Sequence, residues 1–212
     1  MRPLGRSGTV PPGRGPKRGE GDDTDAGGGA ENLERKVHCG AADLAAIRAR
    51  LDCLGVPVCT LAQRDTYFAA ARGRLKLRRI AEEHRHPEAE LIAYHRPTES
   101  GSRWSAYHRI PVAAEDAAAL EAALSETVGT LVAVAKTRAV GIVGQTRVHL
   151  DDVDRLGAFV ELETVVADGD RAAAEAAHAA VVAVLGLERF APVAGSYADL
   201  MLESNEAEQE RA

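Results

Sequence analysis

The feature that most constrains this chain is a pair of short alternating segments in its C-terminal half. Residues 147–151 read Arg-Val-His-Leu-Asp and residues 159–163 read Phe-Val-Glu-Leu-Glu, so polar and apolar residues alternate in both. Side chains two positions apart in a β-strand lie on the same face of a sheet, about 7 Å from each other. The residues between the segments are few enough to fold the two strands into a hairpin.

Such a hairpin brings Asp151, Glu161 and Glu163 together on one face. Neighbouring carboxylates repel one another, so we expect a positive group among them, most simply a divalent cation with oxygen ligands. The alternative is an ordinary amphipathic hairpin whose charges stay in water, and the hairpin alone favours that alternative. The cation site becomes the favoured interpretation because the same alternation recurs elsewhere in the chain with positive charges.

Length and composition are those of an ordinary globular protein. A chain of 212 residues corresponds to one domain with tails, and its net charge of −6 argues against a general nucleic-acid-binding surface. No apolar run approaches the ~18–20 residues of a membrane span, and the basic N-terminus lacks the apolar segment of a secretory signal. The three cysteines lack metal-ligand spacing and are typical of free thiols in a reducing compartment, so we predict a cytoplasmic protein without membrane or nucleic-acid partners.

The ordered part of the chain is predicted to span residues 31–203. Residues 1–30 are rich in Gly, Pro and Arg and then in Asp and Gly, a composition that cannot bury a core, so we predict a disordered tail there. Residues 204–212 are predicted to be a frayed tail.

The alternation and the turn signals predict an α+β fold, an eight-stranded antiparallel β-barrel with helices packed outside. Strands are expected over residues 32–37, 58–68, 74–78, 88–97, 104–110, 130–140, 147–151 and 159–163. Helices are expected over residues 41–54, 115–128 and 170–185.

Charged residues occupy alternate positions in most of these strands. The cations are Lys36, Arg74, Lys76, Arg78, Arg96, Lys136, Arg138 and Arg147, and the carboxylates are Glu34, Asp151, Glu161 and Glu163. The charges could lie outside, around an aliphatic interior. They could instead line a tunnel, with the aliphatic residues facing outward under the helices. The second arrangement is favoured because helices with apolar faces need an apolar surface to cover.

A tunnel lined with cations needs an anionic ligand, because unpaired buried charge is costly. Arg and Lys side chains suit phosphate oxygens, and a carboxylate cluster suits Mg²⁺ or Mn²⁺ bound to those same oxygens. The chain has no glycine-rich phosphate-binding loop. The pattern therefore points to a metal-bound triphosphate held by side chains.

These segments resemble the CYTH domain family, the triphosphate tunnel metalloenzymes, over about residues 31–203. The resemblance rests on the order and spacing of short matches at residues 32–36, 65–68, 73–78, 136–138, 147–151, 159–163 and 196–200. It implies an eight-stranded tunnel that binds a triphosphate with a divalent metal. The family includes class IV adenylyl cyclases, thiamine triphosphatases and inorganic triphosphatases.

The resemblance also implies roles for individual residues. Glu34, Glu161 and Glu163 match the metal-binding glutamates, and Asp151 matches an acidic residue of the same site, so Glu34, Asp151 and Glu161 are the expected catalytic residues. The matching phosphate-binding cations are Lys36, Arg74, Lys76, Arg78, Lys136, Arg138 and Arg147, and Arg96 is expected to join them.

Two departures from the family pattern bear on activity. Asn32 stands where a first glutamate is common, and residues 91–94 lack the lysine with which many triphosphatase members activate water. The resemblance therefore leans toward the class IV adenylyl cyclase-like branch, which would convert ATP to cyclic AMP and pyrophosphate with Mg²⁺ or Mn²⁺. Hydrolysis of tripolyphosphate, thiamine triphosphate or a nucleoside triphosphate is the alternative, and a non-catalytic polyphosphate-binding module is a third. A homodimer is compatible with all three.

Overall fold

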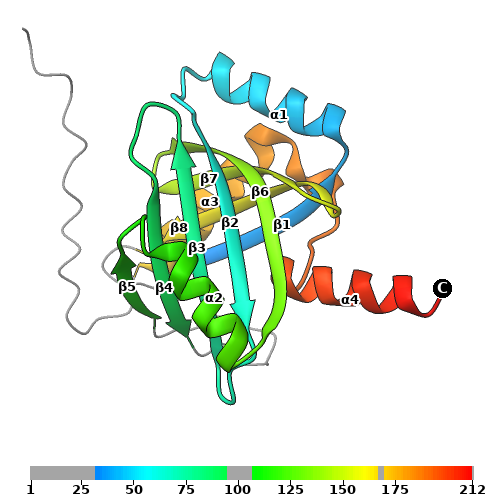
Figure 1. Ribbon diagram of the computed structural model, residues 1–212. Helices are drawn as coiled ribbons and strands as arrows, with labels where there is room; N and C mark the ends of the chain where they lie inside the picture. The colour runs from blue at the N-terminus through cyan, green and yellow to red at the C-terminus, as the bar shows by residue number, and fades with distance from the viewer. Residues whose placement is uncertain (1–31, 95–106, 167–169, 212) are drawn as a thin grey trace, which may run out of the picture.

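The computed structural model describes residues 32–94, 107–166 and 170–211. Within them the chain forms one antiparallel sheet of eight strands and four α-helices, which confirms the predicted α+β class (Figure 1). The strands are β1 (Asn32–Cys39), β2 (Cys59–Phe68), β3 (Arg74–Glu82), β4 (Glu88–Tyr94), β5 (Tyr107–Val112), β6 (Thr130–Val143), β7 (Thr146–Val153) and β8 (Gly157–Val165). The helices are α1 (Ala41–Cys53), α2 (Ala117–Thr127), α3 (Arg171–Leu185) and α4 (Tyr197–Gln209), with a 3-10 turn η2 (Leu187–Arg189) after α3.

The sheet is not closed, so the expected barrel is wrong in this respect for the described residues. The strand order is β1-β8-β7-β6-β2-β3-β4-β5, which leaves β1 and β5 at the two edges. The outer edge of β1 is taken by another segment: Val37 forms a bridge with Pro192, and the Val193 amide donates to the Lys36 carbonyl at 2.8 Å. Because this segment occupies the edge, the described part of β1 pairs with it and not with β5.

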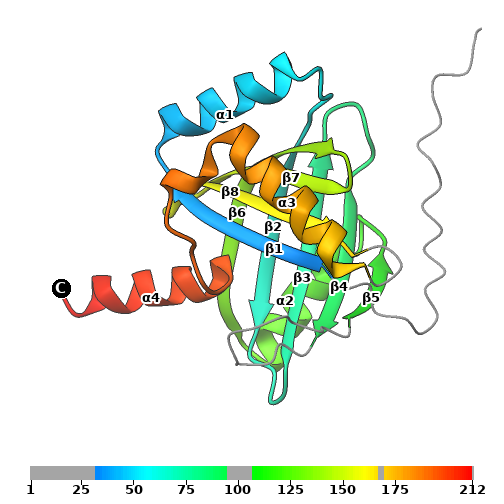
Figure 2. The same cartoon turned by 180° about the vertical axis from the view of Figure 1, so that it is seen from behind.

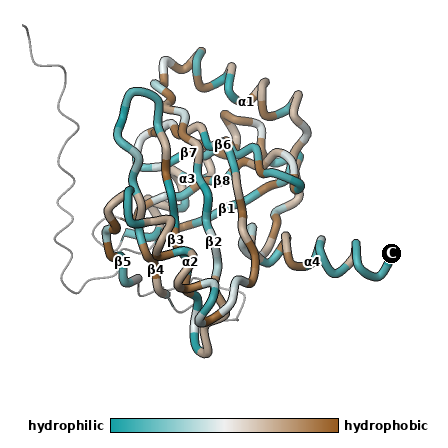
Figure 3. Tube along the Cα trace, in the orientation of Figure 1, coloured by the Kyte–Doolittle hydropathy of each residue, from teal (hydrophilic) through white to brown (hydrophobic). Residues whose placement is uncertain are grey.

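The alternation of polar and apolar residues sorts the side chains of the sheet onto two faces. Directly paired residues of antiparallel strands lie on the same face, and His149 pairs with Glu161 while Glu161 pairs with Lys36. These three residues therefore lie on one face. Hydrophilic residues occur in the body of the sheet as well as at its edges (Figure 3). We call the face with these charges the inner face and the opposite one the outer face.

The main apolar core lies on the outer face, under α1, α3 and η2. These elements cover β1, β8 and β7, as the view from behind shows (Figure 2). Its fully buried members come from both layers: Val37, Val148, Val160 and Leu162 from the strands, and Ile47, Leu51, Leu185 and Leu187 from the helices and turn. Each such side chain contributes about 1.5–3 kcal/mol by leaving water, so this layer anchors the sheet.

Helix α4 was not among the three predicted helices, and it does not pack outside as those were expected to do. Its residues Tyr197, Ala198 and Met201 are buried against Val134 and Phe159, in a second cluster on the inner face. The helix lies away from α1 and α3 (Figure 1). It also continues to Gln209, beyond the domain end expected at residue 203.

The start of α4 is fixed by local hydrogen bonds. The Ser196 hydroxyl and the Asp199 carboxylate form a capping box, which satisfies backbone amides that the first turn leaves unpaired. Gly195, just before it, has a φ of +85° that favours glycine. These residues direct Tyr197 onto the inner face of the sheet.

Two further predictions fall on residues outside the described ranges, and a third concerns membrane spans. The proposed disordered tail, residues 1–30, lies outside the described residues, as does Arg96. Among the described helices, none has both the length and the apolar character that crossing a bilayer requires.

Candidate functional site

The inner face collects buried charges, as in the tunnel arrangement considered above. Lys76 and Lys136 are only 8% and 7% exposed, and Asp151 is fully buried. In the alternative arrangement these side chains would lie in water around an aliphatic centre, but the aliphatic core lies on the outer face instead. Buried charges of this kind are stable only when they are paired and hydrogen-bonded.

The first group of pairs surrounds Asp65 on β2. The Arg78 guanidinium donates to both carboxylate oxygens of Asp65 at 2.9 Å, Lys76 Nζ donates at 2.7 Å, and the Gln63 amide donates at 3.2 Å. Burial alone would raise the pKa of Asp65, but the hydrogen bonds and charges of Arg78 and Lys76 hold it far below its usual range. Burial lowers the pKa of Lys76 to about 8 although Asp65 opposes the shift.

The second group surrounds Asp151 on β7. Arg138 Nε and Nη2 donate to its two oxygens at 2.6 Å each, Lys136 Nζ donates at 3.3 Å, and the Tyr197 hydroxyl of α4 donates at 2.8 Å. Burial favours the neutral acid, but Arg138 and Lys136 lower the pKa of Asp151 below its ordinary value. Burial and the neighbouring Arg138 charge lower the pKa of Lys136 to about 8.

The third group surrounds Glu161 on β8. Lys36 Nζ lies 3.3 Å from one carboxylate oxygen, while Arg138 Nη2 at 3.0 Å and His149 Nδ1 at 3.6 Å approach the other. Burial would raise the pKa of Glu161, but the His149 ring and the Lys36 and Arg138 charges hold it well below its ordinary value. Arg138 thus links the Glu161 group to the Asp151 group.

The remaining predicted cations lie toward the margins of the inner face. Arg74 donates to the Asp199 carboxylate at 2.6 Å and to the Ser196 hydroxyl at 2.9 Å, so it joins β3 to the start of α4. Arg147 is more exposed and lies 3.9 Å from Glu163.

The predicted metal ligands are brought close to one another, with one addition. Glu163 and Glu34 are directly paired across β8 and β1. His149, Glu161 and Glu163 each offer a ligand atom, and these atoms lie within 4.8 Å of one another. Carboxylate oxygens with one imidazole nitrogen are a donor set that divalent metals accept. The residues present therefore fit a divalent ion.

Several residues of this network escaped the sequence reasoning. Asp65 was noted only as part of a matching segment, although its two-residue spacing from Gln63 and Tyr67 placed it on a polar face. Tyr197 and Asp199 were noted only as part of a matching segment, and no helix was predicted there. No local sequence pattern predicts that a helix will pack on the inner face.

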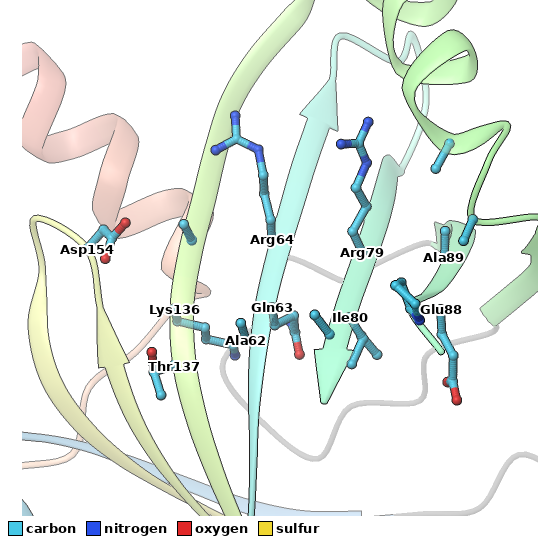
Figure 4. Close-up of a pocket in the computed structure, with 15 residues that line it drawn as sticks. Ala62, Gln63, Arg64, Arg79, Ile80, Glu88, Ala89, Lys136, Thr137 and Asp154 are labelled. Atoms are coloured by element: carbon cyan, nitrogen blue, oxygen red, sulfur yellow. The ribbon is translucent and has the colours of Figure 1, made fainter. Parts of the chain in front are cut away.

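One hollow of the described structure lies between the sheet and α2. A cavity of about 430 Å³ lies beside the start of α2, where Arg64 of β2 and Arg79 of β3 extend side by side (Figure 4). These two arginines alternate with Asp65 and Arg78 along their strands, so they lie on the outer face. Gln63 and Lys136 also line the hollow, so it borders the charged groups described above.

Solved structures share this fold. The PH1012 protein of Pyrococcus horikoshii matches with a TM-score of 0.64 and 18% identity, over 80% of this chain and 98% of its own. The PH1819 protein of the same organism matches with a TM-score of 0.62 and 23% identity, over 82% and 99%. A candidate adenylate cyclase from Vibrio parahaemolyticus matches with a TM-score of 0.55 and 15% identity, over 82% and 99%. At these identities the likeness shows a common fold.

No curated protein sequence matches this chain. The sequence model of the CYTH domain, in contrast, matches residues 30–193, which include all eight strands of the sheet but not Tyr197 and Asp199 of α4. The chain is therefore a member of the CYTH domain family.

Proposed function

We propose that this protein is a divalent-metal-dependent enzyme that acts on a triphosphate, of the class IV adenylyl cyclase-like kind. ATP would be converted to cyclic AMP and pyrophosphate. The observation that carries the proposal is the set of buried and half-buried cations on one face, each paired with a carboxylate of the same face: Lys36, Lys76, Arg78, Lys136 and Arg138.

The paired charges suggest how a triphosphate would be bound. In the free protein Asp65, Asp151 and Glu161 neutralise the cations around them. A metal-bound triphosphate brings both kinds of partner, since phosphate oxygens suit Arg and Lys while the metal suits the carboxylates. On binding, phosphate oxygens would replace the carboxylates as partners of the cations, and the metal would replace the cations as partner of the carboxylates. No buried charge would be left unpaired.

The roles of the residues follow from this exchange. Glu34, Glu161 and Glu163 would hold the metal, which neutralises phosphate charge when bound. The phosphate oxygens would be held by Lys36, Arg74, Lys76, Arg78, Arg96, Lys136, Arg138 and Arg147. These cations fix the chain of phosphates and stabilise the charge that develops on the leaving group, which is the main contribution of protein side chains to such reactions.

In the cyclase reaction the ribose 3′-oxygen bonds to the α-phosphorus. The bond from that phosphorus to the oxygen bridging to the β-phosphate breaks, and pyrophosphate leaves with the electron pair. The hydroxyl proton must pass to a base, and Asp151 is the proposed acceptor once Arg138 and Lys136 turn toward phosphate. Arg138 and Lys136 would then stabilise the leaving pyrophosphate.

Strand β4 supports cyclisation over the alternative, hydrolysis assisted by a lysine. Ile92 pairs with Lys76 across β4 and β3, so the inner-face position of β4 at this level carries an apolar side chain. Ile92 is 3% exposed and cannot accept a proton from water.

The test is incubation of the purified protein with ATP and Mn²⁺, with separate assays for cyclic AMP, pyrophosphate and inorganic phosphate. Cyclic AMP and pyrophosphate in equal amounts support the proposal, and phosphate release without either of them contradicts it. Asp151→Asn should abolish turnover. Its neighbour Asp152 pairs with Thr137 and lies exposed on the outer face, so Asp152→Asn is the matched control and should retain activity.

Hydrolysis is the second candidate, and a panel of tripolyphosphate, thiamine triphosphate and nucleoside triphosphates decides it by phosphate release. If the ligand binds with metal but stays intact over hours, the protein is a binding module. A cytoplasmic location and a homodimer remain predictions alongside this proposal.

A further inference from the structure

We infer that His149 supplies a nitrogen ligand to the metal of this site and thereby makes the site prefer Mn²⁺, Co²⁺ or Zn²⁺ over Mg²⁺. This inference rests on the proposed function, because it concerns the same ion. It differs from the ligand set of three glutamates in adding an imidazole.

The environment of the His149 ring indicates a missing partner. The side chain is 7% exposed, yet within the described residues its Nδ1 atom has no hydrogen-bond partner. Its nearest acidic atom, Glu161 Oε2, is 3.6 Å away, which is too long for a hydrogen bond. A buried polar atom without a partner costs about 1–3 kcal/mol, so such an atom on a charged face points to a group that binds there.

The strand register places this atom among carboxylates. His149 is directly paired with Glu161 across β7 and β8, and Glu163 lies two residues further along β8 on the same face. Metal–ligand bonds of about 2.1 Å allow two ligands to be at most about 4.2 Å apart. The ligand atoms of the three residues lie within 4.8 Å of one another. Small rotations of the two glutamate side chains would therefore close the site around an ion.

Glu163 is able to make that rotation. Its side chain is 24% exposed, and its ion pair with Arg147 is long, at 3.9 Å. The site thus needs little rearrangement on the Glu163 side.

The nitrogen atom determines which ion is favoured. Mg²⁺ binds oxygen ligands almost exclusively, whereas imidazole suits the first-row transition metals and zinc. Replacing one oxygen ligand by His149 Nδ1 therefore shifts the preference away from Mg²⁺. Asparagine at position 149 would present an amide oxygen near the place of Nδ1 and would restore an all-oxygen site.

The experiment is electron spin-echo spectroscopy of Mn²⁺ bound to the full chain, in which a coordinated nitrogen modulates the echo. Wild type should show nitrogen modulation, and His149→Asn should lose it. His38→Asn is the matched control, since His38 lies on the same face of β1, on the far side of β8, is exposed, and packs on Phe159. Titration calorimetry of the same proteins should show the ratio of Co²⁺ to Mg²⁺ affinity falling at least 10-fold in His149→Asn alone.

The outcomes separate this inference from the function on which it rests. If Mn²⁺ binds with triphosphate but wild type shows no nitrogen modulation, water satisfies the imidazole and only the present inference is overturned. If modulation persists in His149→Asn, another residue supplies the nitrogen, which also overturns it. If Mn²⁺ does not bind with or without tripolyphosphate, both the inference and the proposed function fail. Thermal unfolding verifies each variant's fold, and His149→Gln replaces the asparagine variant if that one does not fold.

Discussion

Asp65 shows most directly how this protein keeps charges inside. Its carboxylate is 5% exposed and receives hydrogen bonds from Lys76, Arg78 and Gln63. A buried carboxylate in such surroundings stabilises the fold only while it is ionised. Once it is neutral, the buried cations around it have neither an anion nor water to stabilise their charge. The interior network is therefore both the proposed binding site and a sensitive part of the fold.

Asp65→Asn should lower the free energy of unfolding by about 3–5 kcal/mol, because it leaves two buried cations without their anion. Urea denaturation measures this, with Asp152→Asn on the outer face as the control that should change stability by less than about 0.5 kcal/mol. Because the folded-state pKa of Asp65 is depressed, its contribution is complete above the unfolded pKa of about 4 and is lost as the pH falls below that value. Equal effects of the two variants would contradict this account of Asp65.

The two interior lysines give the second prediction at this scale. The pKa values of Lys76 and Lys136 are lowered to about 8, so both lose charge as the pH rises through that value. Affinity for tripolyphosphate should therefore fall between pH 7 and 9 in titration calorimetry. A Lys76→Arg, Lys136→Arg double variant stays charged over this range and should show a shallower fall. The same pH dependence in both proteins would assign the effect to the ligand.

At the scale of secondary-structure elements, the sequence predicted the strands well where both faces of a strand are constrained. The alternation at residues 147–151 and 159–163 specified β7 and β8, because one face packs under helices while the other is charged. The sequence did not predict α4, and its packing on the inner face depends on contacts with distant strands. It also could not show that the segment at Pro192 takes the edge of β1, since no local pattern records such pairing.

The sequence predicted part of the candidate site for the same reason. The spacing placed Glu161, Glu163 and Asp151 on one face, and the structure has them there. The contacts of Asp65 and the place of His149 beside Glu161 were missed, because a single polar residue in an alternating strand does not reveal its partner across the sheet.

Helix α4 yields the prediction at this scale. Tyr197 donates to the buried Asp151 carboxylate at 2.8 Å, and hydrogen bonds to charged groups contribute about 1.5–3 kcal/mol. Tyr197→Phe should lower the free energy of unfolding by that amount in urea denaturation. The Tyr67 hydroxyl has a weaker contact, with Lys76 Nζ at 3.4 Å, so Tyr67→Phe should cost about 1 kcal/mol or less. A reversed order would show that α4 is not held through Asp151.

For the whole molecule, the central point is the sorting of charge between the two faces of one sheet. The outer face is covered by α1 and α3 over an aliphatic core, and the inner face holds cations paired with carboxylates. This inversion places many cations on one interior face, although the chain as a whole is acidic. Overall charge therefore says little about the ligand of this protein, and the local arrangement says most.

The most direct measurement compares two adjacent arginines on opposite faces. Arg78 lies on the inner face with Asp65, and Arg79 lies on the outer face with Glu121. Tripolyphosphate with Mn²⁺, at about 100 times its dissociation constant, should stabilise wild type by about 2.7 kcal/mol in thermal unfolding. The account predicts the same stabilisation in Arg79→Gln and little or none in Arg78→Gln. Stabilisation of Arg78→Gln equal to that of wild type would place the triphosphate elsewhere and contradict the account.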